Sequence, residues 1–270
     1  MQMKLTVISY NLRNGGCAPK NGVEDGDESR LLKQIEALGT LAGRASGSVA
    51  ICLQEGKYLD RDYHRRLNLL CDRLGMTYRT MLESNHHDCH LIVTMRLEPG
   101  LSVAGTEHDR SGSWWHAQAA AKLQVEGWTE RLWVVNTHLA PASRSKRLSE
   151  AESLRLHRKR AAIIAGDFNA AGADERLPPT YPDVDLVKAQ GKDDRRPARM
   201  EAAGFRDAAI IWGDTTPTVG HCGGWPHRSD RIHTTLPDEA IAEYSIYTKA
   251  GDLSDHLPVA FTVDLAKATR

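Results

Sequence analysis

Short runs of apolar residues recur along this chain, and most of them are too short to form a helix. The most pronounced is 161–165, Ala-Ala-Ile-Ile-Ala, which leads into Gly166 and Asp167. A continuous apolar run of this length predicts a strand buried on both faces, and Gly166 is expected to end it at a turn. The same reasoning predicts further strands at 4–10, 49–55, 78–83, 90–95, 131–139, 205–211, 243–248 and 259–264, with two more within 101–125.

Three other segments are predicted helices. The first follows Ser29, a residue type that favours the N-cap position, and carries leucines and an isoleucine at helical spacing. The second closes at Gly75, a residue type common after a helix C-terminus. Its apolar stripe is Tyr63, Leu67, Leu70 and Leu74. The third covers 144–160. Strands outnumber helices, so the pattern predicts an α/β fold with many buried strands.

Length and composition fit one large domain or two small ones. The 270 residues contain no Pro-, Gly- or Ser-rich linker, no low-complexity segment and no internal repeat, so we expect a single domain over 1–270. Hydrophobic residues make up 41% of the chain, which supports a sizeable core. The 35 basic and 35 acidic residues cancel, so the net charge neither supports nor excludes a nucleic-acid partner.

The cysteines and the N-terminus indicate a reducing compartment. The five cysteines are scattered and odd in number, and Cys52 and Cys71 lie in apolar patterns typical of core thiols. Residues 1–10 predict a strand rather than a signal peptide, and no segment reaches the length of a membrane span. We therefore expect a cytoplasmic protein, with a monomer favoured as its oligomeric state.

Polar side chains follow several predicted strands at the point where each ends. Asp167 and Asn169 follow the central strand, Glu55 ends a second buried strand, and His138 lies at the end of 131–139. Positions two apart in a strand point the same way, so Asp167 and Asn169 face one pocket if the extended geometry continues. A carboxylate beside a carboxamide suits chemistry on an oxyanion with a metal nearby. An Asx-rich turn is the structural alternative.

Three surface features each have two interpretations. The histidines in Asn85-His86-His87-Asp88 either bind a metal or are solvated. The pair Trp114-Trp115, after a Gly/Ser loop, either packs in the core or forms a stacking platform for a base. The predicted helix 144–160 is strongly basic, so it is either a solvated face or a contact surface for a polyanion. Residues 171–200 predict a long irregular excursion.

Taken together and in order, the short segments around these polar residues resemble the endonuclease/exonuclease/phosphatase superfamily. That group includes pancreatic-type deoxyribonuclease, abasic-site endonucleases, tyrosyl-DNA phosphodiesterase, neutral sphingomyelinases and inositol polyphosphate phosphatases. The resemblance extends from Ser9 to Val259. The segments are Ser-Tyr-Asn-Leu-Arg, Leu-Gln-Glu, Asn-Thr-His-Leu, Gly-Asp-Phe-Asn, Arg-Ser-Asp-Arg-Ile and Ser-Asp-His-Leu-Pro-Val.

This resemblance implies both a fold and a reaction. The implied fold is a four-layer sandwich of two packed, mixed and mostly antiparallel β-sheets flanked by helices, with the active site at the edge where strand ends converge. The implied reaction is Mg²⁺-dependent hydrolysis of a phosphate ester by in-line attack of water, with Mn²⁺ able to substitute. The implied metal ligands are Asn11, Glu55 and Asp255.

The resemblance also implies roles for the other polar residues. Asp167 positions or deprotonates the water, while Asn169 and His138 bind the non-bridging oxygens. His256 contacts the phosphate, and Asp230 holds its other ring nitrogen and favours the charged form. The identity of the general base stays open. Four further residues, in or beside these segments, are expected to bind substrate: Arg13, Arg144, Arg228 and Trp225.

Two departures from the abasic-site pattern narrow the function. His138 stands where abasic-site endonucleases usually have a tyrosine, and Asn11-Leu-Arg lacks the aspartate of their asparagine-x-aspartate pattern. These departures favour the deoxyribonuclease, sphingomyelinase and tyrosyl-DNA phosphodiesterase side of the superfamily. The short segments, the basic segment 144–160 and the residues Arg228 and Arg231 then lead us to expect a nuclease or DNA-repair phosphodiesterase, with DNA as partner. The alternatives are a phosphodiesterase or phosphatase for a small molecule or lipid headgroup, and a non-catalytic scaffold.

Overall fold

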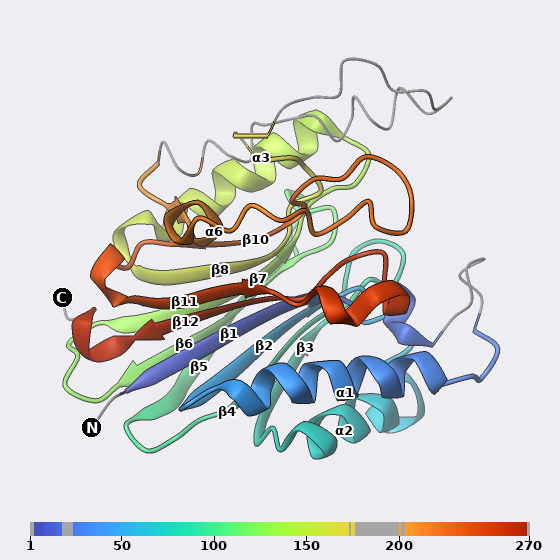
Figure 1. Cartoon of the computed structure of the whole chain (residues 1–270), viewed down its shortest axis with the longest axis horizontal. Coiled ribbons are helices and arrows are strands. Elements are labelled where there is room, and N and C mark those ends of the chain that lie inside the picture. The colour runs from blue at the N-terminus through green and yellow to red at the C-terminus, as the bar shows by residue number, and fades with distance from the viewer. Residues whose placement is uncertain (1–2, 18–23, 173, 176–199, 201–202, 269–270) are drawn as a thin grey trace.

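Two six-stranded β-sheets pack face to face in the computed structural model, with helices on the outer faces of the pair (Figure 1). The structure describes residues 3–17, 24–172, 174–175, 200 and 203–268. Within these residues the architecture is the predicted four-layer sandwich, so the predicted fold class is confirmed.

The first sheet has the strand order β11-β12-β1-β2-β4-β3. Only β1 and β2 pair in parallel, and every other neighbour pair is antiparallel. Its strands are β1 (Lys4–Asn11), β2 (Ser48–Gln54), β3 (Tyr78–Leu82), β4 (Leu91–Arg96), β11 (Ile241–Ile246) and β12 (Val259–Asp264).

The second sheet has the order β5-β6-β7-β8-β10-β9. Here β7 and β8 form the one parallel pair. Its strands are β5 (Leu101–Asp109), β6 (Gln118–Val125), β7 (Arg131–His138), β8 (Ala161–Asp167), β9 (Arg206–Asp207) and β10 (Asp230–Thr234).

Helices cover the outer faces. Helices α1 (Ser29–Arg44) and α2 (Arg61–Leu74) lie outside the first sheet, and α3 (Arg144–Leu154) lies outside the second (Figure 1). The short helix α6 (Ala208–Trp212) packs beside β10 and β11. Short 3₁₀ turns complete the described structure: η1 (Asn14–Gly16), η2 (Arg155–Lys159), η4 (Asp238–Ala240), η5 (Thr248–Leu253) and η6 (Leu265–Lys267).

The apolar run of β8 shows why its strand is buried on both faces. Ala161, Ile163 and Ala165 belong to the core between the two sheets. Ala162 and Ile164 point the other way and pack in a second cluster with residues of α3. Because successive side chains of a strand alternate between faces, a run with no polar residue requires a cover on each side. The sheet on one side and the helix on the other supply it.

Three local predictions are wrong for reasons of backbone geometry. Ser29 is the first residue of α1 rather than its cap, and its N–H donates to Asp27 Oδ1 at 2.8 Å. Tyr63 is 97% exposed because residues 62–64 have positive φ angles, which turns its side chain away from the stripe that Leu67 begins. Gly166 does not end β8, which continues to Asp167.

Two predicted elements are divided in the structure. Segment 205–211 gives the two-residue strand β9 and then α6, because Asp207 accepts the N–H of Ala209 at 3.0 Å and starts a helix there. Segment 144–160 gives α3 followed by the turn η2. Most of the predicted excursion 171–200 lies outside the described residues.

No helix in the described part of the chain is both long and apolar enough to cross a membrane. All five cysteines are free, and Cys52 and Cys71 are buried as predicted.

Candidate active site

The polar residues at the strand ends lie together at one edge of the sandwich. The carboxyl ends of the parallel pairs β1/β2 and β7/β8 lie at this edge, together with the start of β10. The two sheets are joined there by hydrogen bonds between side chains: Asn11 Nδ2 to Asp167 Oδ2 at 3.1 Å and Gln54 Nε2 to Asn136 Oδ1 at 2.7 Å. The edge therefore presents residues from both sheets to one place.

Strand register aligns three of the predicted residues across the second sheet. In β8, Asp167 is the partner of His138 on β7 and of Asp230 on β10. Paired residues on neighbouring strands lie side by side on the same face. The three side chains therefore form a row at the sheet edge. The alternation of side chains along one strand could not have predicted this row, because it depends on the pairing between strands.

Asp167 is the most heavily bonded group of this row and is buried. Its Oδ1 accepts the Ser229 hydroxyl at 2.7 Å and the Asn169 N–H at 2.8 Å. Its Oδ2 lies 3.3 Å from His138 Nε2 and 3.7 Å from His256 Nε2. Burial alone would raise the pKa of Asp167, but the two histidines outweigh it and hold that pKa well below its usual range. The side chain is therefore a carboxylate anion between two histidines.

His256 pairs with Asp230 as predicted. Its Nδ1 lies 2.8 Å from Asp230 Oδ2, and both residues are buried. Burial lowers the pKa of His256, but the carboxylates of Asp230 and Asp167 outweigh it and raise the pKa to about 10. At neutral pH the ring is an imidazolium. Its Nδ1 donates to Asp230, and its Nε2 forms an ion pair with Asp167 at 3.7 Å without a hydrogen bond.

Solved structures share this arrangement of strands. A protein of the endonuclease/exonuclease/phosphatase family from Bacteroides vulgatus is 13% identical, with a TM-score of 0.67 over 97% of this chain and 99% of that one. A second family protein, from Bacteroides thetaiotaomicron, is 14% identical, with a TM-score of 0.63 over 97% and 98%. A truncated TDP2 of Caenorhabditis elegans is 16% identical, with a TM-score of 0.59 over 97% and 98%.

The chain has the endonuclease/exonuclease/phosphatase fold. At the level of sequence, no protein-family model and no curated protein matches this chain. Identities of this size establish the fold alone.

The predicted metal ligands lie beside the row, on the first sheet. Asn11 Nδ2 also donates to Glu55 Oε1 at 3.1 Å, and the Asn14 N–H donates to Glu55 Oε2 at 2.8 Å. Asn11 Oδ1 accepts the Arg13 N–H at 2.9 Å. Asn11 therefore orients Glu55, and direct ligation through its oxygen would compete with the bond from Arg13.

The residue types at this position are those that can bind a hard divalent cation. The carboxylates of Glu55 and Asp255 are partly exposed, in contrast to the buried Asp167 and Asp230. Carboxylate oxygens are the ligands that Mg²⁺ prefers, and this ion keeps several waters, so few protein ligands suffice. Both carboxylates belong to the end of the first sheet, since the Ser254 hydroxyl donates to the Asn11 carbonyl at 2.8 Å.

A second set of donors is close enough to share a metal: Asp167, Asp230 and His256. Within the described residues it is the only such group, so the histidine loop 85–88 is not supported as a metal site. In the second set, however, His256 is already engaged by Asp230 and is protonated at neutral pH. A metal ion there would have to displace the imidazolium proton and break the pair with Asp230.

Asn169 only partly meets its prediction. Its φ is 50°, so the extended geometry ends before it, and its N–H to Asp167 Oδ1 forms the Asx turn that was the structural alternative. Its Nδ2 donates to the Leu139 carbonyl at 2.9 Å. The second amide proton is left for another acceptor.

The four predicted substrate-binding residues lie in different surroundings. Arg13 lies beside the predicted metal ligand Asp255, with its Nε 3.8 Å from Asp255 Oδ2, and both side chains are partly exposed. Trp225 is half-buried and stacks on His227, and its loop lies beside His256 through the β-bridges of Val219. Arg144 is exposed in the first turn of α3, just beyond the end of β7.

Arg228 is a correction. Its side chain is fully buried, its Nη1 donates to Asp207 at 2.7 Å, and its Nη2 pairs with Asp174. Burial lowers the pKa of Arg228, but the carboxylates around it outweigh that effect and raise it. A buried guanidinium held by two carboxylates links α6 to the strand ends and is unable to reach a substrate.

The basic segment 144–160 does not present all of its basic side chains on one exposed surface, as its composition suggested. Arg147 is buried and donates to the Ala140 carbonyl. The exposed basic side chains lie at the two ends of the segment, with Arg144 at its start and Arg155, Arg158 and Lys159 at its far end. The three at the far end precede the start of β8, whereas Asp167 is at its end. At about 3.3 Å per residue they lie roughly 20 Å from Asp167. A substrate bound at the active-site edge would contact them only if it were long enough to cover this distance.

Two further residues lie beside the row of site residues, and the sequence patterns did not indicate either of them. The ring of His116 stacks on that of His138, with centroids 4.2 Å apart and planes at 17°. The buried Glu150 accepts the N–H groups of Trp115 and Ala140 and so ties two loops beside His138. Both contacts arise between segments distant in the chain, and neither residue lies in a short segment typical of the superfamily.

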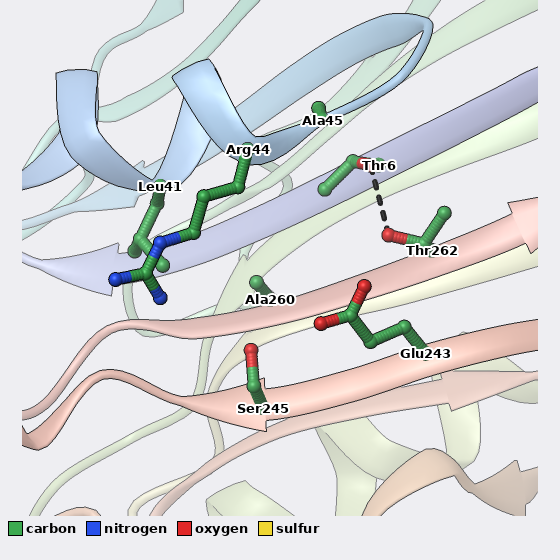
Figure 2. Close-up of a pocket in the computed structure, with 8 residues that line it drawn as sticks. All are labelled: Thr6, Leu41, Arg44, Ala45, Glu243, Ser245, Ala260 and Thr262. Carbon is green, nitrogen blue, oxygen red and sulfur yellow. Dashed lines mark hydrogen bonds between the residues drawn. The ribbon is translucent and has the colours of Figure 1, made fainter.

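Figure 2 shows a different hollow, between the C-terminal end of α1 and strands of the first sheet, with Arg44 and Glu243 facing into it. Its volume is about 30 Å³, room for one or two water molecules. Thr6 lines it, five residues before Asn11 on β1 and so roughly 16 Å away. This hollow is therefore separate from the candidate active site and too small for a substrate.

Proposed function

We propose that this protein is a divalent-metal-dependent hydrolase of phosphate esters. The observation that carries the proposal is the Asp167 carboxylate between the imidazoles of His138 and His256, at the edge where Glu55 and Asp255 offer oxygen ligands. Mg²⁺ held by Glu55 and Asp255 would neutralise phosphate oxygens and activate the reacting phosphorus toward attack. Mn²⁺ suits the same donors.

The protein's own residues supply the remaining functions. His256, kept protonated by Asp230, is a cation that can contact a phosphate oxygen throughout the reaction. The carboxylate of Asp167 can orient or deprotonate the attacking water, since it is ionised and stands between the two histidines. For His138, burial lowers the pKa, but the hydrogen bond and charge of Asp167 outweigh it and raise that pKa, so His138 is a second donor to the phosphate.

A phosphodiester of nucleic acid is the substrate class that we favour. Among the similar structures is a Danio rerio TDP2 complexed with single-strand DNA product, 16% identical to this chain. A DNA-repair role rests on this likeness and is part of the proposal. The five free cysteines support a reducing compartment such as the cytoplasm as the place of action.

A lipid headgroup is less well supported by the surface. A lipid enzyme would be expected to expose apolar side chains at its active-site loops. Trp114 is buried, and Trp115 and Trp225 are each half-buried rather than exposed. The exposed large apolar side chains of the described part are spread over other elements: Tyr63, Leu156, Ile210 and Trp212. A small-molecule diester stays as the second candidate, favoured by the zero net charge of the chain.

A substrate panel tests the proposal. Single-stranded, duplex, nicked and abasic DNA, RNA, a small aryl diester and sphingomyelin are incubated with Mg²⁺, with Mn²⁺ and with a chelator. Hydrolysis of a nucleic acid that requires the metal and weakens steeply with salt supports the favoured class. Hydrolysis of the small diester alone, with little salt dependence, supports the second candidate. No metal-dependent hydrolysis of any phosphate ester contradicts the proposal.

Replacing Glu55 by glutamine is expected to raise the Mg²⁺ concentration needed for half-maximal activity, by about 10- to 100-fold, because an anionic ligand becomes neutral. The fold should survive, since the amide keeps the shape and Glu55 is only partly buried. Activity is measured against Mg²⁺ concentration, with thermal melting as the check on folding. Exposed Glu98 outside the site provides the matched control, Glu98→Gln. An unchanged Mg²⁺ requirement in Glu55→Gln would contradict the assignment.

A further inference from the structure

A groove of about 400 Å³ opens beside the reacting groups, on the second sheet's side of the edge. Three loops form it: the loop between β3 and β4, the loop between β5 and β6, and the segment from the end of β7 into α3. Its lining includes His86, Arg110, Trp115 and Lys146.

The groove offers an aromatic face and positive charge. The indole of Trp115 is half-buried and stacks on His86, with centroids 4.2 Å apart and planes at 29°. His86 is exposed, so the imidazole can leave this face without opening the core. A planar ring of similar size can take its place.

The charged lining residues are both cations. Lys146 Nζ donates to the Gly112 carbonyl at 2.6 Å, which leaves two of its three N–H donors for a ligand. Arg110 pairs with Glu83 at 2.7 Å, and both side chains are at least half exposed. Exposed pairs of this kind contribute little and exchange readily. A ligand with a flat ring and an anionic group therefore complements both the aromatic face and the positive charge of the groove.

The groove is connected to the reacting groups by neighbouring residues. His116 follows Trp115 in the chain, and its ring stacks on His138. Glu150 accepts the N–H of Trp115 at 2.5 Å and that of Ala140, two residues beyond His138, at 2.8 Å. The backbone of Trp115 is thus tied through Glu150 to the segment that follows His138.

We propose that this groove binds the nucleotide next to the scissile phosphate, with its base stacked on Trp115 and its phosphate beside Arg110 and Lys146. This inference rests on the proposed function and narrows its substrate. Base–aromatic stacking needs a free base face, which a paired and stacked duplex does not present. The substrate is therefore an unpaired end or single strand. The flat ring of a base also distinguishes this substrate from a lipid headgroup.

The test is binding in the presence of a chelator, so that no hydrolysis takes place. The probes are a short single-stranded oligonucleotide and an abasic strand of equal length, with dissociation constants measured by anisotropy. Trp115→Ala should weaken binding of the base-bearing strand by about 5- to 150-fold and leave the abasic strand unchanged. Trp115→Phe should retain most of the affinity. Trp212→Ala, in exposed α6, is the matched control and should change neither value.

A second variant tests the charge. Arg110→Gln should weaken both strands and lower the slope of log affinity against log salt by about 0.7, the value for one phosphate contact on a single strand. An equal loss on both strands in Trp115→Ala would overturn the stacking assignment, and so would failure of the wild-type protein to bind the base-bearing strand. The absence of hydrolysis in the substrate panel would overturn the proposed function separately, because binding is measured without the metal.

Discussion

Asp167→Asn is expected to lower kcat/KM by at least about 10³-fold on whichever phosphate ester the protein hydrolyses. The substitution removes a negative charge between two imidazoles and the group that is placed to take a proton from water. Loss of a proton-transfer group typically costs ~10²–10⁴, and loss of a preorganised electrostatic contact ~10²–10³. The effect should therefore be among the largest of any single substitution.

The hydrogen bonds explain why asparagine is a poor substitute despite its shape. In Asp167→Asn the introduced amide could still accept the Ser229 hydroxyl and the Asn169 N–H through its one oxygen. Its nitrogen would then face the Asn11 amide, which in the wild-type protein donates to Asp167 Oδ2. Two donors would meet. His138 would lose the carboxylate that raises its pKa most, and His256 would lose the smaller contribution that Asp167 adds to that of Asp230.

The measurement is kcat/KM at saturating Mg²⁺, with circular dichroism and thermal melting to confirm folding. Asp264→Asn is the matched control, because Asp264 is also a poorly exposed aspartate that accepts a backbone N–H, at the opposite end of β12 from the site. A folded Asp167→Asn protein that keeps more than a tenth of the wild-type kcat/KM would show that Asp167 is not a reacting group.

The sequence predicted best what depends on neighbouring residues. The run Ala161 to Ala165 is apolar at every position, and the structure confirms a strand with a core on each side. The polar residue after each strand also lies where it was expected, because the carboxyl ends of the parallel strands meet at one edge. The predicted contact between Asp230 and His256 is present at 2.8 Å.

The sequence could not predict contacts that arise only from tertiary packing. Arg228 lies in a superfamily-like segment next to the site residues, yet the fold turns its guanidinium inward to Asp207. Nothing near His116 in the chain indicates that its ring stacks on His138. Tyr63 fits a helical stripe, but the left-handed backbone at residues 62–64 moves it into solvent. In each case a long-range contact or a local backbone reversal outweighed the pattern.

His256→Ala and Asp230→Asn are expected to show how the imidazolium is maintained. His256→Ala should lower kcat/KM by roughly 10²–10³-fold, as expected for a lost electrostatic contact. Asp230→Asn should cost less and should move the alkaline limb of the pH–rate profile to lower pH. The double variant should be little worse than His256→Ala alone, because Asp230 acts through His256. A double loss equal to the product of the single losses would contradict the pairing.

The same pair should make stability depend on pH in a defined window. The pKa of His256 is about 10 in the folded protein and near 6.5 in an unfolded chain. The folded state binds the proton more tightly, so this contribution to the free energy of unfolding is complete below about pH 6.5 and is lost as the pH rises toward 10. In Asp230→Asn the carboxylate that raises the pKa most is gone, so the loss should be complete at a lower pH.

Denaturant unfolding between pH 6 and 10, with a chelator present, measures this effect. His256→Gln removes the titrating group and should flatten the fall in stability over the window, apart from changes due to other groups. His64→Gln is the matched control, because His64 is exposed and should leave the fall unchanged. If wild type and His256→Gln lose stability in parallel from pH 6.5 to 10, then His256 is not held as a cation and Asp230 serves only to position a neutral ring.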